Sequence, residues 1–290
     1  MSESSDTSAL LNPSPLSFKE FEDLIKNIER LYALGSRLSQ TIERQACEYL
    51  IQEASMAFAK TLMSLAGFLR FIPSSQFFGS NVQRIIDLSS ASVMARQVLE
   101  DVISFLYLSE PQLTQEQKDF REFVWRFHGF TESIESAEFA NPEDPDIPPI
   151  RAEREKAREL LRNNPLLANI NGDLRGRVRE GDKNQIVYDH EILQRRGIIT
   201  RRYDLPRKVL SNFAHFSALS HKMIIETSGD RQKSWPPFFL PSLSVAAFIA
   251  EGLETFIETF PETTQLLSDN ERQLITNYRS WLRDRKATPK

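Results

Sequence analysis

The sequence has a single cysteine, Cys47, among its 290 residues, so it holds neither an internal disulfide nor a cysteine-based zinc site. This is typical of a reducing compartment, and we expect a cytoplasmic location. Long apolar runs are also missing. The longest nearly unbroken one, residues 240–250, has 11 residues, whereas a helix needs about 20 to span a bilayer. We therefore expect no transmembrane helix and no membrane partner.

Several catalytic motifs are absent as well. The sequence has no phosphate-binding P-loop, no GxGxxG that opens a helix, no GxSxG and no HExxH. It also lacks the ExxH pair of carboxylate-bridged metal sites. These absences argue against phosphate-cradling and metal-cage enzymes, and we expect neither a metal nor another cofactor.

Apolar residues recur at helical spacing along most of the chain, and glycine, with 10 residues, is scarce. Three capping-box patterns mark helix starts: Ser17 with Glu20, Thr114 with Gln117, and Ser268 with Glu271. We expect an all-α fold, a helical bundle of about seven to eight helices that can carry a loop-rich insertion. An apolar helix near residues 242–260 should be its central element.

The chain divides into four segments by composition. Residues 1–15 are expected to form a disordered leader, and residues 16–140 the N-terminal helices of the bundle. Residues 141–203 should hold a Pro-rich loop, a short helix and a basic, turn-rich stretch with room for a hairpin. Residues 204–290 should supply the C-terminal helices of the same bundle.

Local signals refine these boundaries. Gly35 should loosen the first helix, and another helix should run from about residue 81 to 108. The stretch NPEDPDIPP, residues 141–149, should exclude regular structure before a helix at residues 151–162. Asp204 with Pro206 should start the helix that follows the basic stretch.

The segment VLSNFAHFSALSH, residues 209–221, carries two of the four histidines. Ser211 lies four residues before His215, so the two side chains share a helical face, as do Asn212 and His215. His221 points about 120° away from His215. These histidines either pack within the bundle or serve as general acid/base groups, which suits proton transfer during RNA cleavage.

Arg96 and Glu100, four residues apart beside an apolar stripe, form a second candidate group. As an internal ion pair they would orient two helices. If they face His215 instead, the site would combine a cation, a carboxylate and an imidazole.

These residues carry a family resemblance. The pattern of residues 95–100, ARQVLE, followed much later by Leu210-Ser211-x-x-x-His215, resembles an uncharacterised group of bacterial all-helical domains. That group is similar in turn to the HEPN superfamily (higher eukaryotes and prokaryotes nucleotide-binding), and the resemblance covers residues 18–227. It implies a helical homo-oligomer and a metal-independent ribonuclease of a toxin or phage-defence system.

The resemblance also implies roles for individual residues. His215 would be the acid/base, with His221 as a second candidate. Ser211 and Asn212 would position phosphate, Arg96 would stabilise developing charge, and Glu100 would hold Arg96.

The sequence departs from the HEPN signature, in which an arginine precedes the histidine by four to six residues. Arg207 lies one residue too far from His215. Arg121 and His128 match the spacing, but composition alone produces about one such match, and both residues are expected to flank a core-facing helix.

Residues 175–208 hold ten Lys/Arg and five Asp/Glu, although the net charge of the chain is −4. Seven arginines in this stretch are candidates for nucleic-acid contact: Arg175, Arg177, Arg179, Arg195, Arg196, Arg201 and Arg202. The alternative is a solvated loop.

Two functions remain open. The chain is either an RNA-directed HEPN-like protein with ribonuclease activity, or a non-catalytic helical interaction module whose arginines bind an acidic protein partner.

Overall fold

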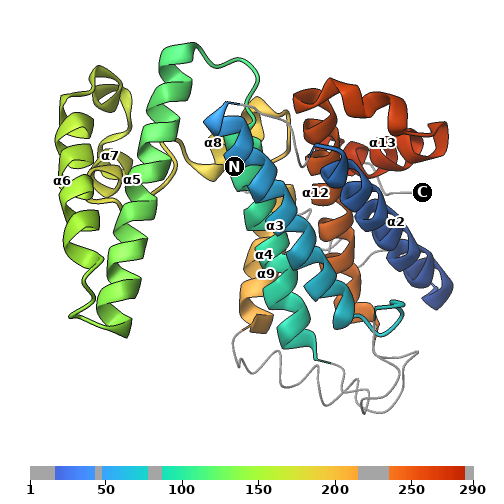
Figure 1. Ribbon diagram of the computed structural model, residues 1–290. Coiled ribbons are helices and arrows are strands. Elements are labelled where there is room, and N and C mark those ends of the chain that lie inside the picture. The colour runs from blue at the N-terminus through green and yellow to red at the C-terminus, as the bar shows by residue number, and fades with distance from the viewer. Residues whose placement is uncertain (1–16, 43–47, 78–86, 215–234, 285–290) are drawn as a thin grey trace, which may run out of the picture. The chain divides into compact units, whose positions relative to one another are not determined.

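The computed structural model of this chain describes residues 17–42, 48–77, 87–214 and 235–284. This part of the chain contains ten α-helices, two 3-10 helices and no strand (Figure 1). The fold is therefore all-α, as the periodicity predicts. Helices outnumber the seven to eight expected because the turn-rich stretch forms several short ones. The expected leader lies outside the described residues.

The helices form two compact units. The first unit comprises Met1–Arg44, Phe58–Val102 and Arg201–Lys290. The second unit comprises Gln45–Ala57 and Ile103–Thr200. Each unit buries its own set of apolar side chains.

In the first unit, α2 (Phe18–Ile42) begins at the predicted capping box. Ser17 Oγ accepts a hydrogen bond from Glu20 N at 3.2 Å, and Glu20 Oε2 accepts one from Ser17 N at 2.6 Å. The expectation that Gly35 loosens this helix is wrong, because α2 continues through it. A Cβ at Gly35 would lie 2.7 Å from Leu62 Cδ2 of α3 (Tyr49–Arg70). The glycine thus permits close helix packing.

The apolar helix α12 (Pro236–Thr259) is buried on most faces, as expected of a central helix. It starts earlier than predicted because Pro236 and Pro237 occupy its first turn, where a proline forfeits no helical hydrogen bond. The helices α2, α9 (Arg201–Ala214) and α13 (Asp269–Arg283) pack on it. By length and composition α12 could cross a membrane, but 83% of its most apolar window is buried inside the protein.

The first and last helices of the first unit contact each other directly. Asn27 Nδ2 of α2 donates to the Tyr278 hydroxyl of α13 at 3.2 Å, and Arg37 Nη2 donates to Glu271 Oε1 at 2.9 Å. The second 3-10 helix, η2 (Pro261–Leu266), connects α12 to α13. The predicted capping box of Ser268 and Glu271 starts α13. The two ends of the described chain are therefore joined within one unit.

α4 (Leu88–Leu108) belongs to the first unit as far as Val102. Ser90 N donates to Asp87 Oδ1 at 2.9 Å, so Asp87 caps the helix. Most of the expected start, residues 81–86, lies outside the described residues. The next helix of this unit, α9, begins at Arg201 rather than at Asp204, and Pro206 lies inside it.

The second unit is built on α5 (Gln115–Ala140) and α6 (Ile147–Asn163), which run side by side (Figure 1). The predicted capping box of Thr114 and Gln117 starts α5. The helices η1 (Pro165–Asn169), α7 (Gly172–Glu180) and α8 (Asp189–Arg195) follow. Its core combines apolar side chains of α5, α6, η1, α7 and the turn between the last two: Phe120, Val124, Phe127, Ala157, Leu161, Leu167, Ile170, Leu174 and Val178.

Two expectations fail in this unit. Residues 141–149 were expected to lack regular structure, but α6 starts at Ile147 rather than at Arg151. Pro148 and Pro149 lie in its first turn, where proline is compatible with a helix. Residues 163–203 contain short helices and no hairpin. Asn171 caps α7, and Gly181 ends it with φ of 86°.

Candidate functional site

Two helices of the first unit bring charged and polar side chains together. Arg96 and Glu100 lie on α4, with Arg96 Nε donating to Glu100 Oε1 at 2.9 Å. Ser211 of α9 accepts a hydrogen bond from Arg96 Nη1 at 3.5 Å, the long end of the usual range. Arg207 of α9 donates through Nε to the same Glu100 oxygen at 3.3 Å. We call these four residues the α4–α9 cluster.

Three of the predicted site residues thus meet in space: Arg96, Glu100 and Ser211. Asn212 is exposed on α9 beside them in sequence. His215 and His221 lie outside the described residues. The helices that carry these residues, α4 and α9, therefore contact each other at the cluster, and whether Arg96 and Glu100 face His215 stays a prediction.

Arg207 is the site residue that sequence reasoning missed. The HEPN spacing excluded it because seven residues separate it from His215. A different signal identifies it: residues 207, 211 and 215 are four apart, so a continuous helix would present all three on one face. The four-residue spacing of a helix face, and not the spacing of the HEPN signature, therefore relates Arg207 to Ser211.

Two guanidinium groups, those of Arg96 and Arg207, contact one carboxylate in this cluster. About a third of each side chain of the α4 pair is accessible, 32% for Arg96 and 34% for Glu100. Solvent and ligands can therefore reach the cluster. Such an arrangement can bind an anion and can stabilise negative charge that develops on it.

Other carboxylates also pair with two arginines each, and two of them, Glu251 and Glu110, are more buried than Glu100. Glu251 of α12 accepts hydrogen bonds from Arg279 and Arg283 of α13, at 3.0 and 2.8 Å, and its side chain is 1% exposed. Burial at this level indicates a structural ion pair that fixes α13 on α12. The α4–α9 cluster is far more open than this one.

The second such carboxylate, Glu110, lies in the second unit and is 19% exposed. It binds Arg121, and Arg195 Nη1 donates to it at 3.0 Å. Burial by itself raises the pKa of the Glu110 carboxyl, but the Arg121 charge and the hydrogen bonds from both arginines outweigh burial and hold that pKa below its usual value. This network joins α5 and α8 to the chain segment after α4.

The structure corrects the expectation for Arg121, one of the two residues with the literal HEPN spacing. Arg121 does not flank the core: its side chain is 2% exposed, donates to the Tyr107 carbonyl and lies 4.2 Å from the centre of the Tyr107 ring. Burial also raises the pKa of Tyr107 to about 12. His128 Nδ1 lies 2.6 Å from the Gly181 carbonyl oxygen. The two residues of the literal HEPN spacing thus make separate contacts within the second unit.

The seven arginines predicted for nucleic-acid contact are divided between the two units, and not all of them are exposed. Arg201 and Arg202 belong to the first unit, and the other five to the second. Arg202 is buried over the Trp281 ring at 4.4 Å. Arg195 is bound to Glu110, Arg175 donates to the Ala168 carbonyl at 3.4 Å, and Arg196 is half-buried.

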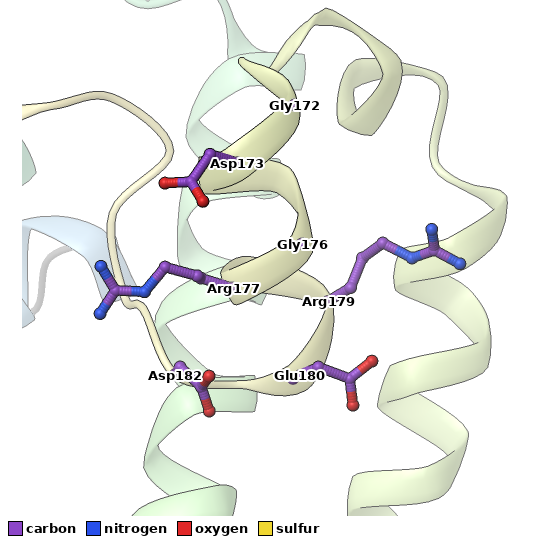
Figure 2. A pocket seen from close by; sticks show the side chains of 7 residues that line it. All are labelled: Gly172, Asp173, Gly176, Arg177, Arg179, Glu180 and Asp182. Carbon is purple, nitrogen blue, oxygen red and sulfur yellow. The ribbon is translucent and has the colours of Figure 1, made fainter.

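Arg177 and Arg179 remain exposed and line an open hollow of about 540 Å³ on α7. Figure 2 shows Arg177 and Asp173 on one side of the helix and Arg179 on the other, with the bare backbone of Gly172 and Gly176 between them. Glu180 and Asp182 complete the lining, and Glu180 is paired with Arg158 of α6. Three acidic side chains line the hollow beside two arginines, whereas two arginines contact one carboxylate in the α4–α9 cluster, so the hollow is less suited to a polyanion.

Within the residues that the structure describes, no group of three or more His, Cys, Asp or Glu side chains could hold a metal ion. No protein-family model, curated protein or solved structure matches the chain. The fold and the cluster define the class: an all-α protein with a solvent-open arginine, carboxylate and serine site between two helices.

Proposed function

We propose that this protein acts on RNA and that the α4–α9 cluster binds the phosphodiester in a metal-independent cleavage. The observation that carries the proposal is the meeting of Arg96, Glu100 and Ser211, residues that are 111 to 115 positions apart across the two helices and yet share one open cluster. Charge-assisted hydrogen bonds from arginine are well suited to phosphate oxygens.

The proposed chemistry needs no metal. The 2′-oxygen of a ribose attacks the adjacent phosphorus, and the bond from phosphorus to the 5′-oxygen breaks. A proton must leave the 2′-hydroxyl and another must reach the departing 5′-oxygen, for which His215 is the proposed acid/base group. Arg96 would stabilise the additional negative charge on the phosphoryl oxygens, and Ser211 with Asn212 would position them.

The test is cleavage of labelled single-stranded RNA of mixed sequence in the presence of a chelator. We expect the wild-type protein to cleave it and His215→Ala to be slower by at least about 100-fold. Arg96→Gln should also be slower by about 100-fold, because it removes charge stabilisation. Lys208→Gln is the matched control. Lys208 is exposed on α9, and this substitution removes a positive charge outside the cluster. Intact RNA after incubation with the wild-type protein would refute the ribonuclease.

Exposed apolar side chains favour a second candidate, a non-catalytic interaction module. In the second unit Phe139 is 94% exposed and Leu160 is 64% exposed. Large apolar side chains that are exposed on a free protein often become buried when a partner protein binds. Under this alternative the wild-type protein would neither bind nor cleave RNA. Phe139→Asp would then abolish binding of a protein partner, while Arg96→Gln would leave that binding unchanged.

A further inference from the structure

The last turn of α5 presents an aromatic ring to solvent. The side chain of Phe139 is 94% exposed, more than any other large apolar side chain that the structure describes. An aromatic ring that a partner covers contributes strongly to binding, and a ring this bare contributes nothing to the core of its own unit.

Carboxylates without a cationic partner accompany this ring. Glu135 lies one helical turn before Phe139, and Glu143 and Asp146 follow in the turn to α6. All three are exposed, and none forms an ion pair with another described residue. No lysine or arginine occurs between residues 127 and 150. We call residues 135–146 the acidic end of the second unit.

The hollow on α7 offers complementary features. Gly172 and Gly176 leave its backbone bare, and a Cβ at Gly176 would meet no atom within 4 Å. Arg177 and Arg179 lie on either side of this backbone (Figure 2). Both are exposed, and neither is paired with a carboxylate in the described part of the chain. A guanidinium group attracts carboxylates and also the face of an aromatic ring.

The hollow contains three carboxylates of its own, and two of them already have partners. Glu180 is paired with Arg158, and Asp173 accepts a hydrogen bond from the Tyr188 hydroxyl at 3.5 Å. Asp182 is exposed at the end of the hollow. Attraction for an acidic surface is therefore local to the two arginines and does not come from the total charge of the hollow.

We infer that this protein pairs with a second copy of itself, and that the acidic end of each copy docks into the α7 hollow of the other. Both surfaces belong to the second unit, so two copies related by a two-fold axis make the same contact twice, and the assembly closes at two. Phe139 covers the bare glycine backbone, and the carboxylates beside it meet Arg177 and Arg179. The inference concerns the second unit alone and does not rest on the proposed action on RNA.

The experiment is sedimentation velocity of the full chain at concentrations from about 1 to 300 µM. We expect the wild-type mass to rise with concentration from 33.4 kDa toward twice that value. Because the charged contacts are exposed, the dimer should dissociate several-fold more readily in about 0.5 M salt than in about 0.05 M salt.

Two substitutions test the apolar part of the contact. Phe139→Ser should weaken the dimer by at least about 30-fold, because it removes the central aromatic side chain. Gly176→Leu should weaken it by at least about tenfold, because the new side chain occupies the hollow while remaining compatible with a helix. Lys208→Glu, at an exposed residue of the first unit, is the control and should change the affinity by less than about twofold. Circular dichroism melting checks that each variant is folded.

Charge reversal tests which two surfaces meet. One variant carries Glu135→Arg with Glu143→Arg, and the other carries Arg177→Glu with Arg179→Glu. Each variant alone should be a monomer, because like charges then face each other. An equimolar mixture should form a dimer again. In that mixture the reversed acidic end of one chain meets the reversed hollow of the other, and the two unchanged surfaces also meet.

Three results would overturn the inference. The first is a wild-type protein that stays a monomer throughout this range, as it would if Phe139 served a different protein. The second is a dimer whose affinity is unchanged by Phe139→Ser or by Gly176→Leu. The third is a mixture of the two charge-reversed variants that remains monomeric although both are folded.

Discussion

Two glycines of the second unit differ in backbone conformation, and this difference decides whether each position tolerates substitution by alanine. Gly176 lies inside α7, and a Cβ built there meets no atom within 4 Å. Gly181, at the end of the same helix, has φ of 86°, and a Cβ there would lie 2.2 Å from Thr131 Oγ1. The same substitution should therefore have opposite effects at positions five residues apart.

We expect Gly176→Ala to stabilise the protein by about 0.5–1 kcal/mol, because alanine loses less backbone entropy in a helix. Gly181→Ala should destabilise it by at least about 1–2 kcal/mol, because a side chain disfavours the left-handed region and collides with Thr131. Urea unfolding of both variants beside the wild-type protein measures the difference. Equal effects would contradict the assigned conformations.

Glu110 gives a second prediction at this scale, since its pKa is lower in the folded protein than its usual value. A carboxyl of this kind stabilises the fold above its unfolded pKa of about 4.3, and the contribution is lost as the pH falls through the lower, folded pKa. We expect Glu110→Gln to be less stable than the wild-type protein by about 2–3 kcal/mol at pH 7, because the buried Arg121 loses its counter-charge.

The difference between the two proteins should shrink as the pH falls below about 4, because Glu110 itself becomes neutral. Denaturant midpoints from pH 7 to pH 2.5 would measure it. Glu143→Gln, a change at an exposed carboxyl, is the control. Its denaturant midpoint should change with pH in the same way as that of the wild-type protein. A constant difference across this range would show that Glu110 does not titrate as inferred.

At the scale of helices, α13 depends on one buried carboxylate for its place on α12. We expect Glu251→Ala to lower the free energy of unfolding by about 3 kcal/mol, at the lower end of the range for a broken buried pair, because Arg279 and Arg283 can partly reach solvent. Chemical denaturation measures the loss. Glu262→Ala, at an exposed residue of η2, is the control, and an equal loss there would contradict the anchoring role.

The same scale shows what local sequence signals can predict. All three capping boxes were located from the sequence, because a cap depends on residues three positions apart. The start of α6 was misplaced, because proline favours the first turn of a helix as well as a loop. The short helices of residues 165–195 were missed because too few apolar residues fall on one face to show a period.

For the whole molecule, the fold class followed from the sequence, whereas the grouping of helices did not. Neither the division into two compact units nor the burial of Arg121 has a local sequence signal, since both depend on contacts between distant segments. At the site, Arg96, Glu100 and Ser211 were identified from spacing on their own helices. Arg207 belongs to the cluster only through its hydrogen bond to Glu100 of α4, a contact between two helices that no local spacing predicts.

The contact of α2 with α13 has a consequence for biosynthesis. Asn27 and Tyr278, which hydrogen-bond to each other, are 251 residues apart, so the first unit stays incomplete until synthesis has passed Tyr278 and this residue has left the ribosome. The second unit needs nothing beyond Thr200 and can be finished while translation continues. During that interval the part of α2 that packs on α12, η2 and α13 has no permanent cover, and nascent chains of this protein should be clients of the chaperones that bind such apolar faces.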